Sequence, residues 1–219
     1  MTPAESLIAL KTHPRKWLER HYLITRAGTP QTFSAQQHHF GSPDHQGIVG
    51  GNTPSRTVGT QVNLGPVHSR GARTFIMTPT VLAAVLSGDA TQASVINVPV
   101  VASASFNGVY AGLGLHDLGT ALGRDFMVTT LLNGCSFVVN GANPSVLHIQ
   151  PTGGMSSAAL RAGLAPHYTA VFGGGGNEYD QNVEDVTIFG VRRGNGWKIY
   201  AQVHTRNVKN IVRVVKLHG

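Results

Sequence analysis

The sequence predicts an α+β protein, with a mostly antiparallel β-sheet or sandwich and a few flanking helices. Many short segments rich in β-branched and aromatic residues follow one another in the second half of the chain, separated by turn-forming residues. The composition agrees, because 27 glycines and only 12% charged residues are typical of short strands and turns. Hydrophobic residues make up 41% of the chain, which is enough apolar material for a packed core.

The clearest helix signals lie in the first half of the chain. Residues Pro3–Tyr22 carry apolar side chains at helical spacing, with a break or restart expected at His13-Pro14. Thr78 can cap a second helix that has Pro79 at its first position and runs to about Leu86.

The other segments are expected to be loops, turns and strands. Residues 28–55, rich in Gly, Pro, Gln and His, are expected to form a long loop, and Met155–Arg161 a short helix. Gly194-Asn195-Gly196 is a strong hairpin signal. The expected strands are Ser94–Val101, Phe126–Leu131, Cys135–Val139, Ser145–Gln150, Tyr168–Phe172, Val186–Val191, Trp197–His204 and Asn210–Leu217.

We expect a single domain over residues 1–219, since no linker or fixed-period repeat divides the chain. The net charge of +7 favours acidic partners, but no basic stripe interleaved with aromatic residues is present, so nucleic acid is not an expected partner. No apolar run approaches the roughly 20 residues that span a bilayer, and no secretory signal is visible at Met1–Leu10. We therefore expect no membrane segment. We also expect the protein to be a monomer.

The only cysteine, Cys135, lies in the most informative stretch of the sequence. Two apolar strands flank the turn-forming tetrapeptide Asn140–Asn143. If the hairpin is symmetric about the middle of that turn, paired residue numbers sum to 283, and Cys135 faces His148 directly. A slip of one residue would place His148 on the other face of the sheet.

A thiol beside an imidazole can perform nucleophilic catalysis. The imidazole can take the thiol proton, hold the thiolate, and later protonate a leaving amine. Gly134 would permit close approach, and the backbone N–H groups near Gly134 and Cys135 are candidate donors to an oxyanion. The alternative is structural, because a lone cysteine in an apolar strand is commonly an inert core residue.

The same residues resemble a known motif. Leu132-Asn133-Gly134-Cys135, followed by His148, is similar to the Leu-Ser-Gly-Cys…His signature of the cytotoxic necrotizing factor-like glutamine deamidases, in particular of a small single-domain member. That signature also has a threonine shortly before the cysteine, which Thr129 matches, and a turn followed by a His-Ile segment. The resemblance covers about 22 residues, and Asn133 stands where the family has serine.

The resemblance implies a reaction and a setting. Cys135 would be the nucleophile, His148 the base, and Thr129 the group that orients the imidazole, with Gly134 and Asn133 beside the oxyanion. The product would be glutamate in place of a glutamine of a target protein, without a metal or organic cofactor. Family members of this kind are bacterial toxins that reach a target-cell cytosol and act on Rho-family GTPases or on a translation-initiation RNA helicase.

Other clusters are weaker candidates for function. His38-His39, His45 and His68, with Asp44 nearby, lack the spacing of a zinc-hydrolase motif and are expected to be solvated loop residues. His116-Asp117 is expected in a turn or helix cap. Gly173–Gly176 is expected to be a flexible loop that could border the active-site mouth, and the acidic run Glu178–Asp185 a solvated loop.

Two rival functions remain open. The same dyad would suit another thiol acyl-transfer enzyme, namely a cysteine protease, a transglutaminase or an amidase. The second rival is a basic binding module without enzymatic activity, which would have Cys135 in its core.

Overall fold

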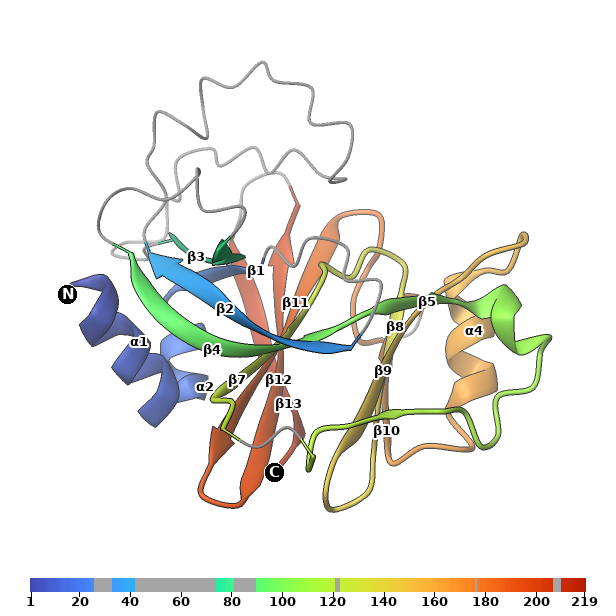
Figure 1. The fold of residues 1–219 in the computed structure, drawn as a ribbon. Helices are drawn as coiled ribbons and strands as arrows, with labels where there is room; N and C mark the ends of the chain where they lie inside the picture. The colour runs from blue at the N-terminus through green and yellow to red at the C-terminus, as the bar shows by residue number, and fades with distance from the viewer. Residues whose placement is uncertain (26–32, 42–73, 81–89, 121–122, 176, 207–209) are drawn as a thin grey trace.

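Two β-sheets make up most of the fold in the computed structural model, which describes residues 1–25, 33–41, 74–80, 90–120, 123–175, 177–206 and 210–219 (Figure 1). The eight-stranded sheet has the order β1 (Tyr22–Thr25), β3 (Thr74–Pro79), β2 (Ser34–Gly41), β4 (Thr91–Val98), β7 (Phe126–Thr129), β11 (Glu184–Arg193), β12 (Gly196–Thr205) and β13 (Ile211–His218). The five-stranded sheet has the order β10 (Ala170–Gly173), β8 (Ser136–Asn140), β9 (Ser145–Gln150) and β5 (Val100–Ala102), with β6 (His116–Asp117) also paired to β9.

Most strand pairs are antiparallel, whereas β1–β3, β4–β7 and β5–β9 are parallel. The described helices are α1 (Pro3–Thr12), α2 (Pro14–Leu18), α4 (Ser157–Leu164) and the short 3-10 helix η2 (Ser103–Phe106). This confirms the predicted α+β class with a mostly antiparallel sheet and few helices.

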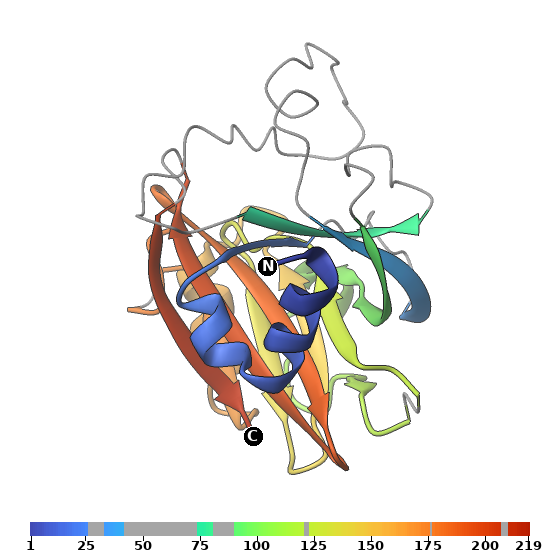
Figure 2. The same ribbon diagram turned by 90° about the vertical axis from the view of Figure 1, so that its left-hand side faces the viewer.

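The core has three layers of apolar side chains. The layer between the two sheets includes Met127, Phe137 and Ile188, all fully buried. On the other face of the eight-stranded sheet, α1 and α2 cover a second layer around Leu18 and Phe189, and Figure 2 shows these helices in front of the strands. A third layer lies where α4 packs on the outer face of the five-stranded sheet.

Side chains of strands near the opposite end of the eight-stranded sheet form hydrogen bonds with the backbone of β1. Gln202 of β12 accepts a hydrogen bond from the Leu23 N–H at 3.0 Å, and Thr187 of β11 donates to the Leu23 carbonyl at 3.0 Å. Gln202 also donates to the Leu18 carbonyl at 2.6 Å. The sheet therefore curls toward closure, with buried side chains in place of a backbone ladder.

The helix predictions are partly confirmed. The first helix breaks at His13-Pro14 as predicted, and Thr2 and Glu5 form a reciprocal capping box at its start. The predicted helix start at Thr78 is wrong, because Thr78 and Pro79 are the last two residues of strand β3; residues 81–89 lie outside the described part. The expected short helix at Met155–Arg161 is α4, displaced by two to three residues.

Strand predictions hold best in the second half of the chain. Ser145–Gln150 has the predicted bounds, and the hairpin at Gly194-Asn195 pairs Arg193 with Gly196. The expected strand Ser94–Val101 divides at Pro99, where the chain passes from one sheet to the other. The expected long loop 28–55 contains β2, whose polar residues gave no strand signal; residues 28–32 and 42–55 lie outside the described part.

Within the described residues, no helix is long and apolar enough to cross a membrane.

Candidate functional site

The hairpin that carries His148 differs from the predicted one by two residues in register. Phe137 pairs with His148 and Asn140 with Ser145, so paired numbers sum to 285 and the turn is Gly141–Pro144. Pro144 has no N–H to donate, so the loop extends to include it. The prediction that Cys135 directly faces His148 is therefore wrong.

An even shift keeps Cys135 and His148 on one face of the sheet. Cys135, Phe137 and Val146 belong to the layer between the sheets, and side chains alternate along each strand, so His148 faces that layer too. Cys135 is one residue before β8 and two positions along from the partner of His148. Diagonal neighbours of this kind have Cα atoms about 7–8 Å apart.

Thr129 joins His148 across the interface between the two sheets. The Thr129 hydroxyl lies 2.7 Å from His148 Nδ1 and donates its hydrogen to the Val98 carbonyl at 2.9 Å. A hydroxyl has one hydrogen, so the Thr129 oxygen must accept the hydrogen of His148 Nδ1. The imidazole is then the Nδ1–H tautomer, with a lone pair on Nε2.

Burial sets the charge state of both candidate catalytic groups. His148 is fully buried, which lowers its pKa to about 3, and its Nε2 atom has no hydrogen-bond partner among the described residues. Cys135 is 7% exposed, and burial raises its pKa to about 11; a backbone hydrogen bond from Asn133 acts in the opposite direction. Both groups are therefore neutral in this conformation, and no thiol–imidazole hydrogen bond is formed.

Glycines on two segments let the backbone pack closely around Cys135. Gly134 has φ +79°, a left-handed conformation that other residues rarely adopt. The Gly174 N–H donates to the Cys135 carbonyl at 3.3 Å, and a Cβ on Gly174 would lie 3.2 Å from the Gly134 Cα. Gly174, from the run Gly173–Gly176 that we expected to border the site, thus contacts the turn that carries Cys135.

Residues 177–184, here called the strap, form the other side of this turn. The Tyr179 hydroxyl donates to the Cys135 carbonyl at 3.0 Å, and Tyr179 is 2% exposed. The prediction of a solvated acidic loop is wrong, because Arg161 pairs with Glu178 and Asp185 is fully buried. Three arginines, from α4, β13 and the end of β12, hold the acidic run.

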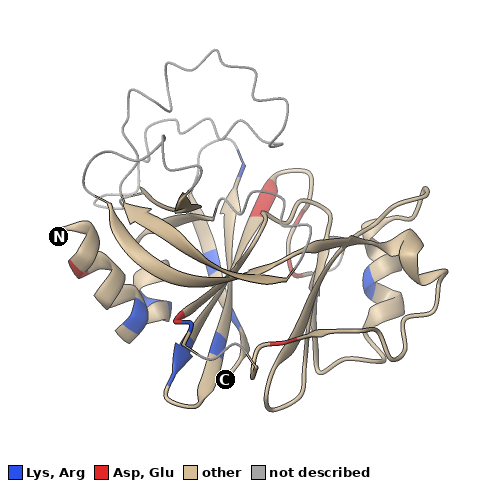
Figure 3. Cartoon of the chain, viewed as in Figure 1, with Lys and Arg blue, Asp and Glu red and all other residues tan. Residues whose placement is uncertain are grey.

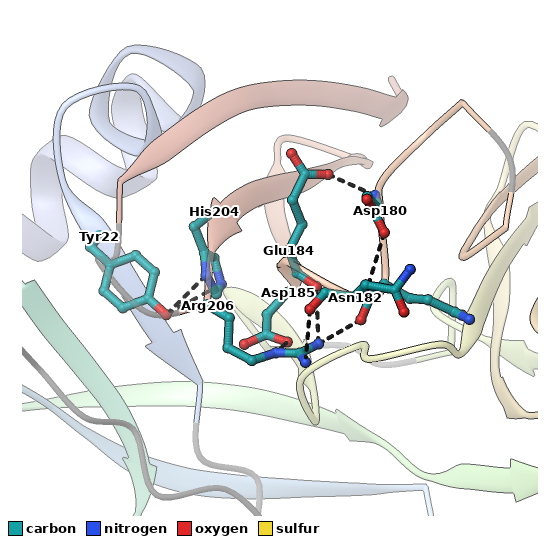
Figure 4. Close-up of polar contacts among 8 residues, drawn as sticks. Tyr22, Asp180, Asn182, Glu184, Asp185, His204 and Arg206 are labelled. Carbon is teal, nitrogen blue, oxygen red and sulfur yellow. Dashed lines mark hydrogen bonds and ion pairs between the residues drawn. The ribbon is translucent and has the colours of Figure 1, made fainter.

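Arg206 is the main anchor of the strap, and Figure 4 shows it beside Asp185 and Asn182. Its Nε donates to Asp185 at 3.1 Å, and its Nη2 donates to the Gln181 carbonyl at 2.7 Å. Nearby, the Tyr22 hydroxyl lies 3.2 Å from His204 Nε2. Buried polar groups of β1, β11 and β12 thus continue from the strap into the curled sheet.

Three site residues were missed by sequence reasoning: Ser157, Tyr179 and Gln181. Ser157, at the start of α4, has its Oγ 3.1 Å from the position of a Cβ on Gly134, and Gln181 Oε1 lies 3.2 Å from the same position. These residues lie 22 to 46 positions after Cys135 in the sequence, and no sequence motif links them to it. The one available signal was the glycine run, which predicts close approach but not its partner.

Within the described part of the chain, no group of three or more His, Cys, Asp or Glu side chains could hold a metal ion. His38 is fully buried on β2 rather than solvated, whereas His45, His68 and Asp44 lie outside the described residues. His116 stacks on Phe33 with ring centroids 4.7 Å apart.

No protein-family model matches the chain, and no curated protein matches it significantly.

Proposed function

We propose that this protein is a cysteine-dependent protein-glutamine deamidase, in which Cys135 is the nucleophile, His148 the general base and Thr129 the residue that orients the imidazole. One observation carries the proposal. Thr129 donates to Val98 and accepts from His148 Nδ1, which leaves a buried Nε2 lone pair without a partner on the face that Cys135 shares. An unsatisfied buried polar atom costs about 1–3 kcal/mol of folding stability. The presence of such an atom on the same face as the cysteine therefore favours a chemical role for it.

The proposed reaction is acyl transfer through a thioester. His148 Nε2 takes the proton of the Cys135 thiol, and the sulfur attacks the carboxamide carbon of a glutamine side chain. The intermediate collapses, and the amide nitrogen leaves as ammonia with the proton from His148. His148 then deprotonates a water molecule, and the oxygen of that water attacks the thioester carbon. The carbon–sulfur bond breaks, glutamate is released, and the protonated His148 returns its proton to the Cys135 thiolate. No metal or organic cofactor takes part.

The resting charge states set a condition on this mechanism. With a thiol pKa of about 11 and an imidazole pKa of about 3, burial opposes the ion pair. Proton transfer therefore requires substrate entry to replace apolar surroundings with polar ones and to bring sulfur and Nε2 together. Catalytic hydrogen bonds are often long in unliganded enzymes and tighten in the substrate complex.

The decisive experiment uses candidate targets suggested by the resemblance, a Rho-family GTPase and a translation-initiation helicase. Each is incubated with wild-type protein, Cys135→Ser and His148→Ala. We expect ammonia release and conversion of one glutamine to glutamate, a gain of about 1 Da, with the wild type alone. Backbone cleavage or amine incorporation would assign a protease or a transglutaminase instead.

Cys135→Ser also separates an enzyme from a basic binding module. The replacement is small, so we expect activity to disappear while the melting temperature changes little. Loss of folding would indicate a structural cysteine. A wild-type thiol that reacts with alkylating reagents only after denaturation, at a rate independent of His148, would refute the catalytic assignment.

The proposed target has an acidic surface. Two basic segments that are far apart in sequence meet around Tyr200. Burial raises the pKa of Tyr200, Arg15 of α2 and Arg193 of β11 act against that rise, and Lys216 is its ladder partner on β13. Figure 3 shows the cationic residues on α2 and on the neighbouring strands. Arg193 and Lys216 have exposed side chains and form no ion pair within the described residues, so a carboxylate-rich protein face would complement them.

The proposed setting is that of a bacterial effector delivered into the cytosol of a target cell, and it rests on the motif around Cys135 alone.

A further inference from the structure

The side chain of Gln181 lies between the two glycines that flank Cys135. Its Oε1 atom is 3.2 Å from the position of a Cβ on Gly134 and 2.8 Å from that of a Cβ on Gly174. The Gly174 N–H in turn binds the Cys135 carbonyl. Gln181 therefore fills a notch, formed by Gly134 and Gly174, that exists because neither residue has a side chain.

The contacts of Gln181 do not explain why a glutamine occupies this notch. Its Oε1 atom is buried and accepts no hydrogen bond from the described residues, which costs about 1–3 kcal/mol. The strap is fixed here by the backbone, since Arg206 donates to the Gln181 carbonyl at 2.7 Å. An apolar side chain of similar size would fill the same space without this cost.

Polar groups around the notch suit a primary carboxamide. Ser157 Oγ is 3.1 Å from the Cβ position of Gly134, and Tyr179 Oη is 3.1 Å from that of Gly174. The Ser157 hydroxyl can donate to a carbonyl oxygen or accept from an NH₂ group, and the Tyr179 oxygen can accept from an NH₂ group. The hydrogen of the Tyr179 hydroxyl goes to the Cys135 carbonyl at 3.0 Å, which places the notch beside the backbone of the nucleophile.

We propose that this notch is the subsite for the carboxamide of the substrate glutamine, and that Gln181 occupies it in the resting protein as a built-in competitor. The inference rests on the proposed deamidase function. A substrate glutamine carries the same CH₂–CH₂–CONH₂ group as Gln181 and must displace it to reach Cys135. In this resting state the Cys135 thiol is 7% exposed, so access to it also requires a rearrangement.

The test measures alkylation of Cys135 in the folded protein, so it needs no protein target. Wild type, Gln181→Ala and Gln36→Ala are treated at pH 8 with iodoacetamide, which carries a carboxamide, and with iodoacetate, which carries a carboxylate. In both reagents the thiolate sulfur bonds to the CH₂ carbon and iodide leaves. Gln36 is an exposed glutamine of β2 and serves as the matched control. Thermal melting verifies that each variant is folded.

We expect Gln181→Ala to react with iodoacetamide about tenfold faster than wild type, since removing a competing group worth about 1.4 kcal/mol changes occupancy tenfold. Gln36→Ala should react at the wild-type rate. The acceleration should be smaller for iodoacetate, and N-acetylglutamine amide should slow iodoacetamide in Gln181→Ala in a saturable manner. Gln181→Asn, with a shorter carboxamide, should be intermediate.

Equal rates for wild type and Gln181→Ala would overturn the occupancy. Equal acceleration for both reagents, without protection by N-acetylglutamine amide, would overturn the carboxamide subsite. Failure of the proposed function has a different signature: no ammonia is released from any target, while the alkylation results above are unaffected.

Discussion

Thr129 and His148 belong to different sheets, and the 2.7 Å contact between the Thr129 hydroxyl and His148 Nδ1 is the polar link that fixes the imidazole between them. The threonine is on β7 and the histidine on β9, and both side chains are fully buried. The tautomer of His148 is therefore determined by the packing of one sheet on the other, since the Thr129 hydroxyl already donates to Val98.

Thr129→Val removes the acceptor for His148 Nδ1 while keeping the shape of the side chain. We expect the activity on a protein target to fall about 10²-fold, within the range that positioned acid–base groups contribute, and the unfolding free energy to fall by about 1–3 kcal/mol. Thr129→Ser should restore most of the activity. Steady-state kinetics and denaturant unfolding are the measurements.

Thr25→Val is the matched control for this variant. Thr25 is also buried and donates to the Thr129 carbonyl at 2.9 Å, but its side chain forms no hydrogen bond with His148. It should cost similar stability without the loss of activity. If both variants lost activity equally, the role of Thr129 would be structural rather than orienting.

The hairpin illustrates what the sequence can and cannot specify. Asn140 and Gly141 predict a turn, and apolar flanks predict two strands, but the register depended on whether Pro144 belongs to the loop. Pro144 lacks a backbone N–H, which disfavours it in a strand, but a symmetric turn would place it there. The sequence does not show which of these two effects is larger. The predicted register was wrong by two residues, an even number, so Cys135 and His148 stayed on one face of the sheet. A shift by an odd number of residues would have placed them on opposite faces.

Long-range contacts were beyond sequence reasoning for a different reason. Tyr179 is separated from Cys135 by 44 residues, and its hydroxyl reaches the Cys135 carbonyl because arginines from three elements hold the strap. Likewise β2 is a strand because it is paired on both edges, by β3 and β4, despite a polar composition. Local propensity contains no information on contacts between distant segments or on which strands will pair.

The pH dependence of stability should carry a signature of His148. Burial lowers the pKa of His148 from 6.5 to about 3, so the unfolded chain binds a proton first as the pH falls. The unfolding free energy therefore has its full value, as far as His148 is concerned, above pH 6.5. It falls progressively as the pH is lowered from 6.5 to about 3. His38, with a pKa lowered to about 4, acts in the same window.

His148→Gln removes one of these two titrations. Relative to wild type, its unfolding free energy should vary less steeply with pH between 6.5 and 4, as measured by urea unfolding at several pH values. His13→Gln, the same substitution at an exposed position, is the control. A His148→Gln slope equal to that of wild type would mean that the imidazole is not kept neutral by burial.

Tyr179→Phe tests whether the hydroxyl positions the nucleophile. The variant loses the donor to the Cys135 carbonyl, so we expect a stability loss of about 0.5–1.5 kcal/mol and a lower kcat with little change in KM. Tyr168→Phe is the control, because the Tyr168 hydroxyl donates to the Tyr110 carbonyl at 2.6 Å, away from Cys135. An equal kcat loss in both variants would rule out a specific role for Tyr179.

Arg206→Met should loosen the strap over Cys135. The variant loses the hydrogen bonds to Gln181 and Asn182 and the ion pair with Asp185, whose carboxylate is fully buried. We expect a stability loss of about 2 kcal/mol or more and faster alkylation of Cys135 at pH 8.

Charge alone does not account for this effect, because the fork of the guanidinium binds several carbonyls at once. Arg206→Lys should therefore recover only part of the stability and of the protection of Cys135. Lys11→Met breaks an exposed ion pair with Asp125 and should cost less than about 1 kcal/mol without changing the alkylation rate. If Arg206→Met lost stability while Cys135 stayed as slow as in wild type, the strap would be anchored independently of Arg206.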